Sequence, residues 1–216
     1  MLKKIRKIGI IKTIKLNFKL FKFSEAIKFP ILVSKNTKIE LLKDSKIVVK
    51  TLKIGIIKIG FGDVGIFDFD RESTKIENKG TIVFNGYANI GFGSKIINEG
   101  YLEFGNDFVI TARTNIWCKK KIKFGKNVLI SWDNLIMDTD AHHIIDRYSN
   151  SKLNDDGEIN ISDNVWIGCR SLILKNTFIG SNNIIAAKSK ISGKFLEEYC
   201  IVGENLKVLK KNIIWK

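Results

Sequence analysis

Residues 161–192 read ISDNVWIGCRSLILKNTFIGSNNIIAAKSKIS, and this stretch decides the fold. An isoleucine recurs every six residues without a break, at Ile161, Ile167, Ile173, Ile179, Ile185 and Ile191. The residue that follows each isoleucine is small in five of these six units. A repeat at fixed spacing indicates the architecture more directly than local propensities do. The sixfold spacing therefore predicts a hexapeptide-repeat solenoid.

A second period, of 20 residues, lies upstream. Segments that begin at Gly80, Gly100 and Lys120 align, and each contains three six-residue units plus two residues. Equivalent apolar positions are Phe84, Phe104 and Phe124; Ile90, Ile110 and Ile130; and Ile96, Ile116 and Ile136. If each unit is a short strand and a bend, three units close one triangular coil, and the coils stack as parallel strands around a shared apolar core. We therefore predict an all-β fold.

The repeat also divides the chain. We expect a basic N-terminal arm at 1–38, the solenoid at 39–192, and a C-terminal tail at 193–216. The sixfold register fails once, after His142, where residues 143–160 have the polar composition of a loop. Insertions in solenoids leave from one face, often the functional one.

Competing folds fit less well. A leucine-rich repeat would need its LxxLxLxxN pattern, which the sequence lacks. An amphipathic helix would need apolar residues at a spacing of 3.6, whereas sixes dominate. Within the arm, residues 14–20 alternate apolar and polar side chains, which favours a strand there.

The composition is that of a folded chain with a basic surface. Of 216 residues, 44% are apolar and 27% charged, and 37 Lys and Arg against 22 Asp and Glu give a net charge of +15. Such a surface attracts phosphates, nucleic acid or anionic lipid. Three cysteines without CxxC spacing favour a reducing cytoplasm, and no stretch reaches the roughly 20 apolar residues of a membrane span. Nucleic-acid binding has no recognisable reading motif behind it.

The two histidines, His142 and His143, lie where a regular coil ends and the loop begins, just after Asp138 and Asp140. A neutral imidazole can take a proton from a hydroxyl and return it to a leaving group, and a nearby carboxylate can fix its tautomer. This arrangement indicates a general base. The alternative is that the histidines are plain loop residues and the aspartates only solvate a turn.

Two stretches carry a family resemblance. SWDNLIMDTDAHHII at 131–145 and NVWIG at 164–168 resemble the hexapeptide-repeat acetyltransferases that modify surface polysaccharides, and maltose, galactoside and chloramphenicol-type acetyltransferases share the wider pattern. The similarity covers roughly residues 80–210. It implies a left-handed parallel β-helix, a homotrimer, and acetyl-CoA bound between subunits, with no metal. The handedness comes from the resemblance alone, because most parallel crossovers are right-handed.

The resemblance also assigns residues. It implies His142 as the base, although His143 stays open, with Asp138 and Asp140 beside it. For the cofactor it implies a set of positions, namely Trp166, Gly168, Ala186, Ala187, Ser189, Lys190 and Lys207. Trp166 would lie along the pantetheine arm, or else pack at a subunit contact. The two lysines would reach phosphates, or else remain solvated. The tail IVGENLKV at 201–208 resembles the family's terminal segment but lacks its proline.

The resemblance implies an acetyl-CoA-dependent O-acetyltransferase acting on a hydroxyl of a sugar, or a lipid-linked sugar, in capsule or lipopolysaccharide synthesis. The alternatives are a non-catalytic solenoid scaffold and an acetyltransferase for a small soluble acceptor. A zinc enzyme of the carbonic anhydrase type would need three separated histidines. The N-terminal arm is expected either to bind the inner membrane surface or to cover the edge of the first coil.

Overall fold

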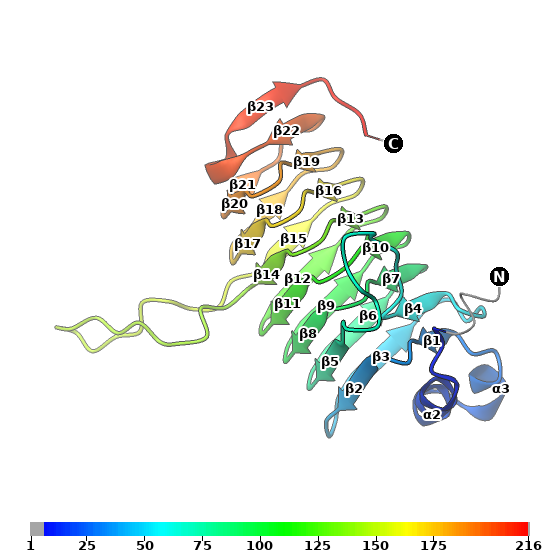
Figure 1. The fold of residues 1–216 in the computed structure, drawn as a ribbon. Coiled ribbons are helices and arrows are strands. Elements are labelled where there is room, and N and C mark those ends of the chain that lie inside the picture. Colours follow the sequence, from blue (N-terminus) through cyan, green and yellow to red (C-terminus); the bar gives the residue numbers. More distant parts are fainter. Residues whose placement is uncertain (1–6, 216) are drawn as a thin grey trace.

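The computed structural model of the protein describes residues 7–215, and the first six residues of the predicted basic arm lie outside the described residues. The described chain forms a column of stacked coils whose strands make three sheets (Figure 1). Successive strands along the chain belong to different sheets, and each strand pairs in parallel with the equivalent strand one coil later. This is the predicted solenoid.

The strands fall into three sets. One sheet contains β1 (Ile31–Val33), β4 (Ile57–Ile59), β7 (Ala88–Ile90), β10 (Phe108–Ile110), β13 (Leu129–Ile130), β16 (Trp166–Ile167), β19 (Ile184–Ile185), β22 (Cys200–Val202) and β23 (Val208–Lys211). A second contains β2 (Thr37–Leu41), β5 (Thr74–Asn78), β8 (Lys95–Asn98), β11 (Asn115–Cys118), β14 (Leu135–Met137), β17 (Leu172–Leu174) and β20 (Lys190–Ile191). The third contains β3 (Lys46–Val49), β6 (Thr81–Phe84), β9 (Tyr101–Phe104), β12 (Lys121–Phe124), β15 (Ile159–Ile161), β18 (Phe178–Ile179) and β21 (Lys194–Phe195).

The strand register confirms that the periodic residues form columns. Ile116 lies beside Ile96 on one side and Ile136 on the other, and Ile136 in turn lies beside Ile173. These four side chains are all at most 2% exposed. Alternate residues of a strand point to opposite faces, so the periodic residue of each strand enters the core while the residues directly beside it face away from the core. The isoleucines of the sixfold repeat therefore stack in one continuous core.

Phenylalanines fill the wider part of this core. The ring of Phe104 stacks on Phe84 at 5.1 Å between centroids and on Phe124 at 5.7 Å, and Phe108 approaches it at 4.6 Å. All four rings are at most 3% exposed. The 20-residue period therefore places identical rings directly above one another in successive coils.

Asparagines turn the chain at several corners of the coil. Asn164, Asn176 and Asn182 have φ values of 62°, 62° and 61°, in the left-handed region. Asparagine tolerates this conformation better than most residues with a β-carbon. Each one ends a six-residue unit, so the next strand can start in a new direction.

The N-terminal arm corrects one prediction. Residues 14–20, predicted as a strand, lie within the helix α2 (Ile10–Leu20), which is followed by the short helix α3 (Phe23–Ala26). Along this segment Leu16 is buried whereas Ile14 and Phe18 are exposed, so the alternation of residue types did not report alternating burial. The helix packs beside β1 because contacts with the first coil outweigh the weak local preference for a strand.

The sheets extend further than predicted in both directions. They begin at β1, ahead of the predicted start at residue 39, and continue through β22 past residue 192. After a short 3-10 turn (Glu204–Leu206), β23 folds back antiparallel on β22 and covers the last coil. Among the described residues, none of the helices has the length and apolar character needed to cross a membrane.

We expect Phe104→Ala to lower the free energy of unfolding by about 3–5 kcal/mol, because it opens a cavity that three neighbouring rings cannot fill. Tyr148→Ala truncates a ring that is 93% exposed and serves as the control, with an expected change below about 0.5 kcal/mol. Denaturant titration measures both values. Equal losses in the two variants would contradict a core built from stacked rings.

Candidate active site

A long excursion separates β14 from β15. In Figure 1 it appears as a yellow-green extension that leaves the coils and returns to them. An antiparallel bridge joins Ile145 to Lys152, and the amide of Leu153 donates to the carbonyl of Ile144 at 2.8 Å. The coils below and above remain paired through β12 and β15 and through β14 and β17. The insertion therefore leaves the stacking intact, and the loop has its own folded base.

Asp138 fastens the first residue of the excursion to the preceding coil. Its side chain is fully buried, and its carboxylate accepts hydrogen bonds from the backbone amides of Lys119, Lys120 and Lys121 at 2.7, 2.9 and 2.7 Å. Its carbonyl oxygen accepts from the amide of Gly157 at 2.9 Å, which closes the loop. The structure thus gives Asp138 an anchoring role.

Asp140 pairs with a cation of the next coil. Its carboxylate contacts Nζ of Lys175 at 2.5 Å and accepts from Nδ2 of Asn154 at 2.9 Å. These two hydrogen bonds, that of Lys175 first, lower the pKa of the Asp140 carboxyl below its ordinary value. The carboxylate therefore stays charged at neutral pH, and it holds the loop against β17 and the residues that follow.

Asn154 holds the backbone on both sides of the predicted base. Its Nδ2 also donates to the carbonyl of His142 at 2.8 Å, and its Oδ1 accepts from the amide of Ile144 at 2.6 Å. The amide of His142 in turn donates to the carbonyl of Asp140 at 2.7 Å. Asn154 is only 9% exposed although it lies in a polar loop. Sequence reasoning missed it, because one buried asparagine among several loop residues carries no local pattern.

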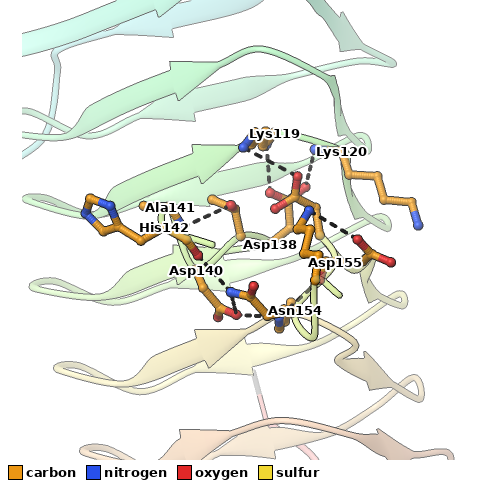
Figure 2. A network of polar contacts seen from close by, with 12 residues as sticks. Lys119, Lys120, Asp138, Asp140, Ala141, His142, Asn154 and Asp155 are labelled. Carbon is orange, nitrogen blue, oxygen red and sulfur yellow. Dashed lines mark hydrogen bonds and ion pairs between the residues drawn. The ribbon is translucent and has the colours of Figure 1, made fainter. Parts of the chain in front are cut away.

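His142 points out of this network. Figure 2 shows its imidazole directed away from Asp138, Asp140 and Asn154. Both His142 and His143 are exposed, and within the described chain neither ring takes part in a hydrogen bond or ion pair. The sequence places the two aspartates beside His142, but the structure does not bring their carboxylates to the ring. Their catalytic role stays a prediction, while the exposed imidazole on a held backbone is free to meet a substrate.

Several predicted cofactor residues gather on another part of the surface. Trp166 lies in β16, and its Nε1 donates to Oγ of Ser131 at 3.0 Å. Gly168 and Ala187 occupy the following turn in successive coils, packed so closely that a β-carbon on Gly168 would lie 2.6 Å from the Ala187 amide. Ala186 lies beside them and Ser189 is buried in the same corner. Of these small residues, Ala187 is exposed and Ala186 is partly exposed, whereas Gly168 and Ser189 are buried.

The two predicted phosphate contacts also lie near one another. Lys190 is exposed in β20, and the 3-10 turn Glu204–Leu206, which packs against β20, is followed directly by Lys207. An unpredicted residue joins this region. Trp215 donates from Nε1 to the carbonyl of Asn164 at 2.9 Å, and its ring lies 6.3 Å from that of Trp166. The described chain shows no hydrogen bond or ion pair between this group and His142.

We expect Asn154→Ala to release the loop base, so that the amide of Ile144 exchanges hydrogen about tenfold faster, the loss of roughly one hydrogen bond. Arg147→Ala changes an exposed loop residue without a contact in the network and is the matched control. Hydrogen exchange followed by mass spectrometry on peptides spanning 139–155 measures both. Unchanged exchange at Ile144 in the Asn154 variant would refute the clamp.

Known proteins resemble this chain in sequence and in fold. No family model matches the chain. It is 28% identical over 201 residues to an uncharacterised 24.8 kDa protein in the cps region of Klebsiella pneumoniae, covering 92% of this chain and 87% of that protein. It is 29% identical over 136 residues to a polysialic acid O-acetyltransferase of Escherichia coli O1:K1, which is 60% of this chain and 44% of that protein.

The fold has a solved counterpart. The crystal structure of the polysialic-acid-specific acetyltransferase NeuO matches with a TM-score of 0.57 and 20% identity, over 85% of this chain and 90% of that one. This likeness confirms the predicted left-handed parallel β-helix. The sixfold repeat and the three-sheet coil thus give the chain the fold of a hexapeptide-repeat acetyltransferase, and its sequence is similar to that of a polysialic acid O-acetyltransferase.

Proposed function

We propose that the protein is an O-acetyltransferase that moves an acetyl group from acetyl-CoA to a sugar hydroxyl during surface polysaccharide synthesis, in capsule or lipopolysaccharide. The observation that carries this proposal is the exposed imidazole of His142 on a backbone clamped by Asn154. The similarity to a polysialic acid O-acetyltransferase supports the acceptor class, a polysaccharide hydroxyl. The proposed location is cytoplasmic, because acyl-CoA donors are available there.

In this reaction His142 acts as the general base. Its neutral ring removes the proton from the acceptor hydroxyl while the oxygen attacks the thioester carbonyl. The bond between the carbonyl carbon and sulfur then breaks, and the imidazolium returns the proton to the departing thiolate. The products are an O-acetyl ester and free coenzyme A. Backbone N–H groups near the carbonyl would stabilise the transient negative charge.

The donor would bind along the turn that carries Gly168 and Ala187. Ala187 is exposed there, so this turn could meet an extended, amide-containing chain. Trp166 offers an apolar indole beside it, and Lys190 and Lys207 supply positive charge for the donor's phosphates. We therefore assign these five residues, with Ala186 and Ser189, to acetyl-CoA.

His142 follows β14, whereas Trp166 lies in β16, which belongs to another sheet. We infer that a second copy of the chain brings the two residues together. The excursion exposes apolar side chains, with Ile144 at 55%, Ile145 at 46% and Leu153 at 61%. A projecting loop of this kind gains by packing on a neighbour. A loop that meets a different surface on the next copy makes a heterologous contact, and repeated contacts of this kind form a ring when the rotation closes. We propose a homotrimer in which His142 of one subunit faces the donor turn of the next.

We expect His142→Ala to reduce acetyl transfer by about 10²–10⁴-fold, because it removes the proton acceptor. His143→Ala is the matched control and retains most activity. Thiol release from acetyl-CoA, measured over a panel of sugars and nucleotide sugars, tests both. Full activity in His142→Ala would remove the assigned base, and no turnover of any acceptor by the wild type would favour a scaffold.

A triple change of Ile144, Ile145 and Leu153 to serine is expected to dissociate the assembly. The mass in solution should fall from three times the 24.6 kDa of one chain to that of one chain, because the loop loses its apolar contacts. Serine at Ile54, Ile66 and Leu196, which are 77%, 67% and 69% exposed and lie outside the loop, is the control. Light scattering measures the mass, and an unchanged trimer would show that the loop does not join the subunits.

A further inference from the structure

Helix α2 buries a partly polar face. Nδ2 of Asn17 donates to the carbonyl of Ile31 at 2.7 Å, and Oδ1 of Asn17 accepts from the Ile31 amide at 3.1 Å. Oγ1 of Thr13 accepts from the amide of Val33 at 3.1 Å. These side chains satisfy the free edge of β1 as another strand would. The helix therefore seals the first coil with Thr13, Leu16 and Asn17.

Its outward face is apolar instead. Ile10, Ile14 and Phe18 follow one another at a spacing of four and are 63%, 42% and 42% exposed. The patch is continued by Ile11, at 69%, and by Phe23 and Ile27, at 72% and 50%. We call these six residues the outer apolar patch, made of Ile10, Ile11, Ile14, Phe18, Phe23 and Ile27. Figure 1 shows α2 and α3 side by side at the end of the column away from β23.

A row of lysines borders the patch. At 100° per residue, Lys15 and Lys19 fall on the sector of α2 next to Phe18 and Ile11, and Lys22 follows the end of α2 as the residue before α3. All three are exposed, and among the described residues they form no ion pair. We call them the lysine row. Residues 7–30 contain six lysines against one acid, Glu25.

The combination selects one kind of partner. An exposed apolar stripe beside a basic row, on a helix lying across the end of a domain, is the arrangement of a helix that rests in the interface of an anionic membrane. A second copy fits poorly, because a two-fold contact through the same patch would bring two lysine rows together. We propose that the outer apolar patch and the lysine row dock the protein on an anionic lipid bilayer.

Membrane docking is independent of the acyl transfer reaction. The helix edge that seals β1 and the face that meets lipid are different sectors of α2, so sealing and docking take place together. Apolar side chains enter the boundary between headgroups and acyl chains, while each lysine near the surface strengthens binding about fivefold. The docking surface belongs to the end of the column away from β23.

The test is sedimentation of the full-length protein with phosphatidylcholine vesicles, with and without phosphatidylglycerol. We expect binding to the anionic vesicles, and the triple variant Lys15→Gln, Lys19→Gln, Lys22→Gln should weaken it about a hundredfold. The matched control changes three exposed lysines elsewhere to glutamine, namely Lys126, Lys188 and Lys210, and should keep binding nearly intact. Equal losses in both triple variants would show that overall charge, rather than this surface, binds lipid.

A second variant tests the apolar contribution. Ile11→Ser, Phe18→Ser, Phe23→Ser should reduce binding by at least about tenfold while the melting temperature stays unchanged, since all three side chains are exposed. If the wild-type protein does not bind anionic vesicles, the proposal is overturned. A lower mass in solution for this variant, without vesicle binding by the wild type, would instead make the patch a contact between copies.

Discussion

Each coil of this protein buries its inward side chains largely against the coils before and after it. Ile116 has Ile96 and Ile136 as its neighbours, and Phe104 has Phe84 and Phe124, so no coil has a core of its own. Because the first and last coils each lack one neighbouring coil, both ends of the column must be covered by other elements. Helix α2 closes the first coil through side-chain hydrogen bonds to β1, and β23 closes the last by antiparallel pairing.

The stacking of coils also accommodates the long excursion that carries His142. The chain leaves after β14 and returns at β15 in register, because the strands on both sides already have partners in adjacent coils. Three polar anchors then hold the base of the excursion against the coils. Asp138 binds the backbone of the preceding coil, Asp140 pairs with Lys175 of the next, and Asn154 fixes the backbone at His142. A rigid column thereby presents an exposed imidazole on an ordered loop base.

The sequence predicts those parts of the structure that repeat. Sixfold spacing locates the core columns, because the same position of each six-residue unit faces inward in successive coils. It does not reveal Asn154 or Trp215, whose partners are far away in the sequence and visible only after folding. Asp138 looked like a partner of His142 because it is close in sequence, but its carboxylate faces backbone amides instead. The predicted strand at 14–20 was wrong because local alternation cannot report which side faces β1.

The central claim is that His142 of one subunit completes the donor site of another, and mixing two inactive variants tests it most directly. His142→Ala and Trp166→Ala subunits are unfolded together, refolded as a mixture and assayed for acetyl transfer. A shared site predicts about a quarter of wild-type turnover, because random assembly pairs an intact His142 with an intact Trp166 in that fraction of interfaces. No recovery above the separate variants, in mixed assemblies of confirmed composition, would contradict the account.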